Sequence, residues 1–273
     1  MSSEPKLVEK VQEIVEKVSN FRLSHGGTYT GEMLHNKMNG EGVLVYDNGD
    51  IYSGNWIDSK KYGFGSYTSA SGAVYEGQWV ENRKQGLGRQ YYTKSGGCYE
   101  GNWWNNTKQG SGKQVYEDGS EYTGDWLANN KSGHGSLVLS NGDVYTGMWT
   151  DNHKSGQGSY TYKNGDIYTG LWLKGKKSGH GDYKYTNGDI YTGLWANDMK
   201  CGLGTYRYAT NDEYCGNWLN NQRHGIGRLT RSNGDIFNGD FKFDVKYGNG
   251  VMTKSDGSVV KGIWISGELS SIH

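Results

Sequence analysis

The residues with the most reactive side chains are few and far apart in this sequence. His134 and His180 each stand in the middle of a Gly-x-Gly triplet. If the triplets lie two β-hairpins apart, the imidazoles are about 20 Å apart, because neighbouring strands are about 4.8 Å apart. Metal ligands must all lie about 2 Å from one ion, so these histidines predict no shared metal site.

Residues 170–176 come nearest to a nucleotide-binding motif. Gly170, Gly175 and Lys176 approximate a phosphate-binding loop, but Lys177 follows where Ser or Thr would hold magnesium. No helix pattern follows that would aim its N-terminus at a phosphate. No Ser, His and carboxylate set stands outside a repeated pattern either. We therefore expect no catalytic residue, no metal and no cofactor, and a protein that is not an enzyme.

A regularly spaced set of basic residues is the third feature with chemical potential. We expect these residues in long loops, stacked about 10 Å apart along one positive edge. Such an edge attracts acidic lipid head groups or an acidic protein partner, and the candidates for that role are Lys84, Lys108, Lys131, Lys154, Lys177 and Lys200, here called the lysine ladder. The alternative is that they serve only solubility and edge protection, partly balanced by acids such as Asp143 and Asp166 at the opposite turns.

These lysines belong to a repeat that organises the chain. The motif Tyr-x-Gly-x-Trp recurs every 23 residues, as in Tyr52-Ser53-Gly54-Asn55-Trp56, with one step of 24 residues from Tyr75 to Tyr99. Side chains alternate between the faces of a strand, so Tyr, Gly and Trp point to one face. A Gly-x-Gly triplet follows each tyrosine position eleven residues later, which predicts a second strand in every repeat.

Two kinds of connection join these strands. Segments such as Asn48-Gly49-Asp50 lead from a Gly-x-Gly strand to the next tyrosine strand, and Asn-Gly predicts a tight turn with positive φ at both central residues. The connection from Trp56 to the next Gly-x-Gly strand reads as longer and polar. The predicted fold is all-β: an elongated, twisted, single antiparallel sheet, a solenoid of β-hairpins, with a short N-terminal amphipathic helix. Each repeat is expected to contact only its neighbours.

The pattern Y-x-G-x-W-x-x-x-x-x-x-G-x-G-x-Y-x-x-x-x-G-x-x-Y resembles that of MORN repeats over residues 27–264. The resemblance implies an extended antiparallel sheet with a groove lined by aromatic residues, and a role as an attachment module in cytoskeletal, ciliary or membrane-apposed assemblies. Asn211 replaces a turn glycine, and the repeats that begin at Tyr29 and Phe237 lack Trp. We divide the chain into an N-terminal helix and linker (1–24), ten repeats with a terminal half-repeat (25–265), and a short tail (266–273).

The aromatic face supplies the leading candidate for a binding site. A single sheet cannot bury both of its faces, so we expect part of this face to form an apolar groove, and exposed apolar strips mark protein-binding sites. A helix or extended peptide laid in the groove would be held by rings such as Tyr99, Trp103, Tyr122, Trp126, Tyr145, Trp149, Tyr168 and Trp172. The alternative is that most of these rings are core.

Residues 5–21 depart from the repeat. Their apolar residues recur at spacings of three and four, which predicts an amphipathic helix. This helix either covers the open edge of the first hairpin or docks on a partner through Val8, Val11, Val15 and Val18, which hold a coiled-coil spacing. Glutamates on its polar side oppose insertion into an anionic membrane.

Charge and composition narrow the setting. The 29 basic and 29 acidic residues cancel, which argues against nucleic acid as a partner. Residues 1–10 are polar, and no run of about 20 apolar residues is present, so we expect neither a secretory signal nor a membrane span. Cys98, Cys201 and Cys215 show no paired spacing, which fits a reducing compartment. We expect a cytoplasmic protein of the cytoskeleton.

Two functions of different classes follow from these observations. The first is a non-catalytic scaffold or adaptor that binds protein partners through the aromatic groove in a cytoskeletal assembly; the family resemblance suggests a cilium, an axoneme and its radial spokes. The second is a phospholipid-binding membrane tether that uses the lysine ladder. Lipid binding predicts a steep loss of affinity with salt, and groove binding predicts little salt dependence. Homodimerisation through the sheet edges stays open.

Overall fold

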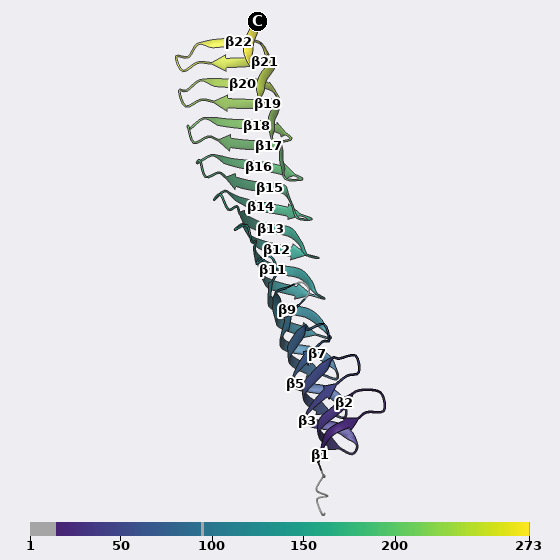
Figure 1. Ribbon diagram of the computed structural model, residues 1–273. Coiled ribbons are helices and arrows are strands. Elements are labelled where there is room, and N and C mark those ends of the chain that lie inside the picture. Colours follow the sequence, from purple (N-terminus) through teal and green to yellow (C-terminus); the bar gives the residue numbers. More distant parts are fainter. Residues whose placement is uncertain (1–14, 94–95, 273) are drawn as a thin grey trace, which may run out of the picture. The chain divides into compact units, whose positions relative to one another are not determined.

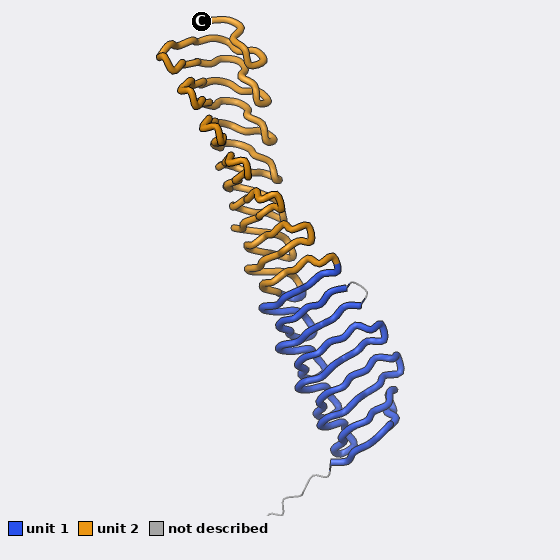
Figure 2. The backbone as a smooth tube through the Cα atoms, turned by 60° about the vertical axis from the view of Figure 1, so that its left-hand side comes forward, with its two compact units in different colours: residues 1–117, 127–129 blue, residues 118–126, 130–273 orange. Residues whose placement is uncertain are grey.

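The computed structural model describes residues 15–93 and 96–272, and all regular structure in them is β (Figure 1). The strands form one open antiparallel sheet of 23 strands, which confirms the predicted all-β antiparallel fold. The chain divides into two compact units (Figure 2): residues 1–117 with 127–129, and residues 118–126 with 130–273. In each unit the paired strands follow one another in chain order, as expected for a repeat array.

Unit 1 contains the strands β1 (Glu16–Arg22), β2 (Thr28–Leu34), β3 (Lys37–Val45), β4 (Ile51–Ile57), β5 (Lys60–Thr68), β6 (Val74–Val80), β7 (Arg83–Tyr91), β8 (Cys98–Trp104) and β9 (Thr107–Val115). Seven-residue strands that carry the tyrosine motif alternate with nine-residue strands that carry Gly-x-Gly. The alternation begins at β2, because β1 lies outside the repeat.

Most of β10 (Glu121–Leu127) lies in unit 2, followed by β11 (Asn130–Val138), β12 (Val144–Thr150), β13 (His153–Thr161), β14 (Ile167–Leu173), β15 (Lys176–Lys184), β16 (Ile190–Ala196), β17 (Met199–Arg207), β18 (Glu213–Leu219), β19 (Gln222–Thr230), β20 (Ile236–Lys242), β21 (Val245–Thr253), β22 (Val259–Ile265) and β23 (Glu268–Ile272). β23 lies in the segment that we expected to be a tail, and it pairs with the half-repeat strand β22.

The two kinds of hairpin turn are the reverse of what we predicted. The tight two-residue turn joins each tryptophan strand to the next Gly-x-Gly strand: Asp58 and Ser59 have φ of 47° and 63°. In the Asn-Gly-Asp connection only Gly49 has positive φ, 89°. There the Gly49 N–H donates to the carbonyl oxygen of Tyr46, and the Tyr46 N–H donates to that of Asp50. This is a three-residue turn that ends in a glycine bulge.

A pair of glycines lets a tyrosine ring lie flat on the sheet. Gly54 of β4 is directly opposite Gly65 of β5, and the ring of Tyr52 crosses this pair. A Cβ on Gly65 would collide with that ring. The Tyr52 hydroxyl donates to the carbonyl oxygen of Asn55 at 3.1 Å, so the ring is fixed and fully buried. Each repeat thereby makes its core on one sheet face, with little aliphatic surface.

The N-terminal helix prediction is wrong over residues 16–21, which lie in β1. This strand pairs with β2 across contacts such as Val18 with Gly31. An open sheet edge offers unpaired backbone groups, and their hydrogen bonds favour a strand over the helical period of the side chains. Val15 precedes the strand and is exposed, and Val18 is half-buried within it. Val8 and Val11 lie outside the described residues.

Candidate protein-binding surface

The rings that we predicted to line a groove lie in the core. Tyr99, Tyr122, Tyr145 and Tyr168 have no exposed surface, and Trp103, Trp126, Trp149 and Trp172 are 4–5% exposed. Tyr145 contacts Trp149 of its own repeat and Trp172 of the next, edge to face, with ring centres 5.2 and 5.3 Å apart. Edge-to-face contacts of this kind link successive repeats. These rings support a surface made by other residues.

The lysine ladder lies on strands, against our prediction of long loops. Its ammonium groups lie over aromatic rings of the inner face, the sheet face that carries the core tyrosines and tryptophans. Lys84, Lys108, Lys131, Lys154, Lys177 and Lys200 all place Nζ 4.0–5.6 Å from the centre of at least one ring. Burial lowers the pKa of Lys84, Lys154 and Lys200 to about 8, and it also lowers the pKa of Lys131 and Lys177. The ladder therefore does not form an outward positive edge.

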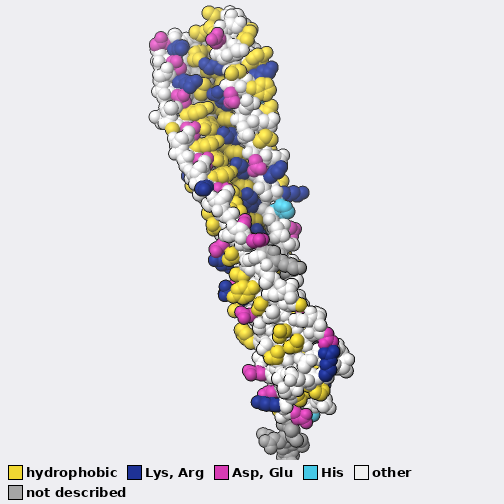
Figure 3. Space-filling model, viewed as in Figure 1, with side chains coloured by type: hydrophobic (Ala, Val, Ile, Leu, Met, Phe, Trp, Pro, Cys, Tyr) yellow, Lys and Arg dark blue, Asp and Glu magenta, His cyan; other side chains and the backbone are white. Residues whose placement is uncertain are grey.

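A second set of tyrosines covers part of the core in unit 2. They come in Tyr-x-Tyr pairs at the ends of β13, β15 and β17, and all are half-buried: Tyr160, Tyr162, Tyr183, Tyr185, Tyr206 and Tyr208, here called the tyrosine strip. The distances between the ring centres of successive tyrosines in this list are 4.6, 5.7, 4.4, 5.8 and 4.5 Å. Figure 3 shows a band of hydrophobic side chains, with basic ones among them, over the C-terminal part of unit 2.

The first tyrosine of each pair is fixed from two sides. Tyr160, Tyr183 and Tyr206 lie on the core tryptophans of the next strand, with ring centres 5.9–6.0 Å apart. Their hydroxyls donate to Asp143, Asp166 and Asp189 at 2.7, 2.9 and 2.7 Å. The bond from Tyr160 lowers the pKa of Asp143 below its usual range. The first ring of each pair is therefore held in place before any partner arrives.

The second tyrosine of each pair begins a turn. Tyr162, Tyr185 and Tyr208 follow directly after β13, β15 and β17. Their backbone N–H groups donate across the turn to the carbonyl oxygens of Asp166, Asp189 and Asp212 at 2.9 Å. The Lys177 ammonium donates to the Tyr162 hydroxyl at 3.1 Å.

Our sequence reasoning missed the tyrosine strip. It treated the repeat as one aromatic face and singled out only the Tyr-x-Gly-x-Trp rings. The signal that identifies the strip is the Tyr-x-Tyr pair, which recurs at the 23-residue period three times in succession, at residues 160–162, 183–185 and 206–208. The neighbouring repeats carry Leu137 with Leu139 and Leu229 with Arg231 at these positions, which limits the strip to three repeats.

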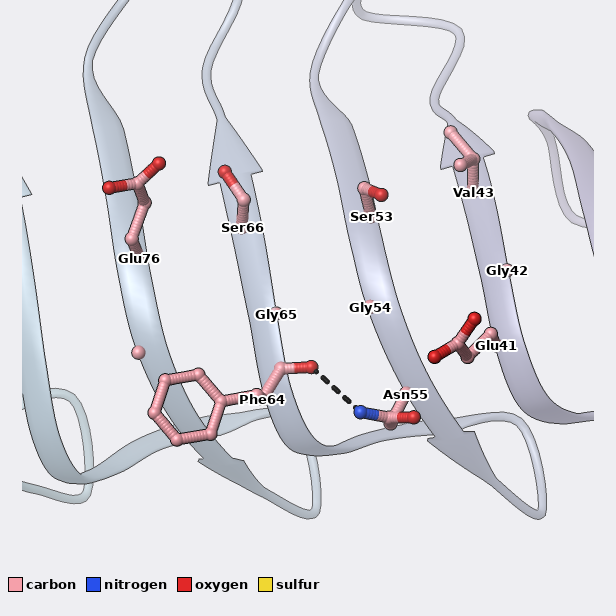
Figure 4. A pocket seen from close by; sticks show the side chains of 11 residues that line it. Glu41, Gly42, Val43, Ser53, Gly54, Asn55, Phe64, Gly65, Ser66 and Glu76 are labelled. Carbon is pink, nitrogen blue, oxygen red and sulfur yellow. Dashed lines mark hydrogen bonds between the residues drawn. The ribbon is translucent and has the colours of Figure 1, made fainter.

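The opposite sheet face carries a hollow of mixed lining in unit 1. A cavity of about 640 Å³ lies over the glycine rows of β3 to β6 (Figure 4). Glu41, Glu76, Ser53 and Ser66 surround it, and Asn55 donates from its side chain to the carbonyl oxygen of Phe64 at 3.1 Å. Among residues 15–93 and 96–272, no three His, Cys, Asp or Glu side chains gather closely enough to hold a metal ion. The same part of the chain contains no helix that would cross a bilayer.

Comparison with known proteins identifies the repeat. The family model described as MORN repeat matches ten consecutive segments, residues 29–51, 52–74, 75–96, 99–121, 122–144, 145–167, 168–190, 191–213, 214–236 and 237–259. No curated protein matches the chain in a sequence comparison.

Solved structures also match the chain at low identity, two TCP domains among them. The TCP10 domain of Danio rerio CPAP, in complex with a peptide of Danio rerio STIL, is 12% identical, with 84% of this chain and 98% of that one covered and a TM-score of 0.42. The SAS-4 (dCPAP) TCP domain of Drosophila melanogaster, in complex with a proline rich motif of Ana2 (dSTIL), is 13% identical, with 56% and 83% covered and a TM-score of 0.35. Likenesses this weak carry no inference about a ligand.

Proposed function

This chain belongs to the MORN-repeat family, and from that premise we propose that it is a non-catalytic scaffold that holds a protein partner against the tyrosine strip. The observation that carries the proposal is the unbroken contact of six half-buried tyrosine rings in unit 2. Tyrosine combines a large ring with few rotatable bonds, and it is enriched among residues that dominate binding energy. A regular row of such rings offers a partner several equivalent anchors.

We extend the proposal to the cellular setting that the family suggests. A repeat array that carries several equivalent ring anchors is suited to attach one component of a cytoskeletal assembly to another. We propose a cytoplasmic location at the cytoskeleton, with the ciliary axoneme and its radial spokes as the specific setting.

The runner-up function, a phospholipid tether, receives less support from the side chains. Anionic head groups require ammonium groups at the outer surface. Lys177 and Lys200 are 9% and 8% exposed, and their Nζ atoms lie over the inner-face rings. A membrane would have to reach them across the strip.

Capture of partners from cell extract tests the proposal. The intact chain is compared with a Tyr162→Ala/Tyr185→Ala/Tyr208→Ala variant, in which the second ring of each pair is removed and the buried core tyrosines stay. The matched control is Leu173→Ala/Leu203→Ala, which removes side chains that are 61% and 64% exposed on the opposite face. Each variant is first checked for an unchanged β-type circular dichroism spectrum.

We expect specific proteins to bind the intact chain and the control and to be lost from the tyrosine variant. Partners that bind the tyrosine variant as well as the intact chain would contradict the proposal. Pelleting with anionic liposomes runs in parallel. Liposome binding that is lost in Lys154→Glu/Lys200→Glu, with no protein captured, would favour the tether instead.

A further inference from the structure

Given the proposed scaffold function, on which this inference rests, we propose that the occupant of the tyrosine strip is a proline-rich segment in the polyproline II conformation. Such segments dock in aromatic-lined sites in many proteins, because their backbone is already extended and loses little entropy on binding. Three features of unit 2 favour this occupant. They are the spacing of the tyrosine pairs, the presence of lysine ammonium groups that can donate hydrogen bonds, and nearby carboxylates that already accept hydrogen bonds within the protein.

The spacing of the tyrosine pairs matches one turn of polyproline II. The pairs lie on β13, β15 and β17, so they repeat at every second strand. Two strand spacings amount to about 9.6 Å. A polyproline II helix has three residues per turn and rises about 9.3 Å per turn. Prolines at positions i, i+3 and i+6 of one segment therefore all face the strip, each over one tyrosine pair.

Other peptide conformations fit this period less well. In an extended strand the residues on one face recur about every 6.6 Å. Such residues cannot lie over successive tyrosine pairs that are about 9.6 Å apart. In an α-helix the residues on one face that come closest are seven apart, or about 10.5 Å, so each repeat adds a mismatch of about 0.9 Å. The polyproline II mismatch is about 0.3 Å per repeat, small enough for ring contacts to be kept over all three pairs.

The floor of the strip offers donors that have no acceptor in the protein. The ammonium groups of Lys154 and Lys200 lie over rings of the strip, 4.5 Å from the centre of Tyr160 and 4.6 Å from that of Tyr206. Neither Nζ donates to any residue that the structure describes. Among the described residues neither Nζ is a fully buried nitrogen without a hydrogen bond, so each keeps some contact with solvent, although Lys200 as a whole is only 8% exposed.

A proline-rich segment is complementary to these donors. Its backbone carbonyl groups make no internal hydrogen bonds, and proline has no N–H to satisfy. The carbonyl oxygens are negative ends of dipoles and attract the two ammonium groups. The nearby acceptors are already used: Asp143 and Asp189 accept from Tyr160 and Tyr206 and from backbone N–H groups. A ligand rich in N–H donors would therefore have to compete for these carboxylates or use the tyrosine hydroxyl oxygens.

The test is fluorescence anisotropy of a labelled oligoproline about twelve residues long, roughly four turns, titrated with the full chain. A Gly-Ser peptide of the same length is the control ligand, because it is flexible and carries N–H groups. We expect saturable binding of oligoproline only. Binding should weaken at least about tenfold in Tyr162→Ala/Tyr185→Ala/Tyr208→Ala, since three ring anchors are lost. Lys154→Met/Lys200→Met should weaken it by a smaller factor, and Leu173→Ala/Leu203→Ala should leave it within about twofold.

Each outcome decides the inference. No saturable binding of oligoproline at about 1 mM, or equal binding by the triple alanine variant, overturns it. If the triple variant fails to fold, Tyr185→Ala alone serves, and it should weaken binding severalfold by removing the central pair. The proposed scaffold function is judged separately: a captured partner that depends on the strip but is not displaced by oligoproline refutes this inference and leaves the scaffold standing.

Discussion

Two regions of the molecule share one core and differ in the residues that cover it. On β13, β15 and β17 of unit 2 the position opposite the core tyrosine holds Tyr160, Tyr183 or Tyr206. In unit 1 the same position of β7 and β9 holds Gln90 or Gln114, both buried. The core tyrosines of both regions are fully buried over paired glycines. The repeat therefore fixes the framework, and one position in each repeat sets the character of the inner face.

The replacement of glutamine by tyrosine at this position changes the hydrogen bonds of the neighbouring lysine ammonium groups. Lys84 and Lys108 donate to the side-chain oxygens of Gln90 and Gln114, so these lysines are satisfied within the protein. Lys154 and Lys200 meet tyrosine rings instead and keep donors available. The ammonium groups beside Gln90 and Gln114 thus have acceptors within the protein. Those beside Tyr160 and Tyr206 can still donate to a ligand.

The largest effect should come from the shared core and should be equal in both regions. Gly88→Ala in unit 1 and Gly181→Ala in unit 2 each place a Cβ against a core ring, that of Tyr75 or Tyr168. Because rings so tightly held cannot move aside, we expect each change to lower the free energy of unfolding by about 3 kcal/mol. Urea unfolding of the full chain measures it. A loss in only one region would show that the two cores differ.

The next effect should separate the regions by function. Exchange of the strip's central residue, Tyr183→Gln, should reduce binding of oligoproline about tenfold, because the glutamine cannot replace the ring contact. The reciprocal change in unit 1, Gln90→Tyr, should leave oligoproline binding unchanged, because it completes only one Tyr-x-Tyr pair, with Tyr92. The repeats on either side carry Tyr67 with Ser69 and Gln114 with Tyr116. Both are measured by the anisotropy titration. Equal loss in the two variants would mean that binding depends on general stability.

A smaller effect should show that the lysines are satisfied differently. Lys84→Met leaves the buried Gln90 oxygen without its donor, so this change should cost about 1–2 kcal/mol more unfolding free energy than Lys154→Met. Lys176→Met, at an exposed residue on β15, controls for loss of a surface charge. Equal cost for Lys84→Met and Lys154→Met, both at half-buried residues, would refute the difference between the regions.

The smallest effect concerns pH, and both regions should share it. Burial lowers the pKa of Lys84 and Lys154 to about 8, below the ordinary value of 10.5. Between these values the unfolded chain binds more protons than the folded one, so stability should rise with pH from about 8. Burial raises the pKa of Tyr145 to about 12, so above pH 10 the unfolded tyrosines ionise first and stability should fall.

Thermal unfolding from pH 7 to pH 11 measures this pH dependence, with an expected maximum near pH 10. The variant Lys84→Met/Lys154→Met should show a weaker rise below that maximum, because two of the titrating groups are gone. A monotonic fall in the unfolding temperature from pH 7 upward would contradict the lysine assignment.

The strand order and the inner face were predictable from the repeat. The period-two pattern of Tyr52, Gly54 and Trp56 determines which face a side chain occupies, and it was enough for the antiparallel sheet. It does not indicate how deeply each side chain is buried on that face. The glycine pairs allow a tyrosine to lie flat, and this buries the Tyr-x-Gly-x-Trp rings and leaves the surface to the second tyrosines. That outcome depends on contacts between repeats, which a single repeat does not reveal.

The turns and the N-terminal strand were mispredicted for separate reasons. The tight turn has a local signal at its second position, which we did not weigh: Asn82, Asn106 and Asn152 have φ of 66–69°, and Asn adopts positive φ more readily than most residues. The strong signal, Asn48-Gly49, belongs to a different turn that uses the glycine for its bulge. In β1, pairing with the edge of β2 overrides the helical spacing of Val15 and Val18.

Hydrogen bonds between neighbouring repeats suggest how the tyrosine strip could be lengthened by added repeats. Asp198, in the turn after β16, accepts from the Lys177 backbone N–H, and Asn221, in the turn after β18, accepts from that of Lys200. Each of these two hydrogen bonds joins one repeat to the next. Duplication of a 23-residue segment such as 176–198 would then insert one more tyrosine pair in phase and lengthen the strip by about 10 Å, or three ligand residues. In such an array, each duplicated repeat would increase the length of the ligand segment that can be bound by the same fixed step.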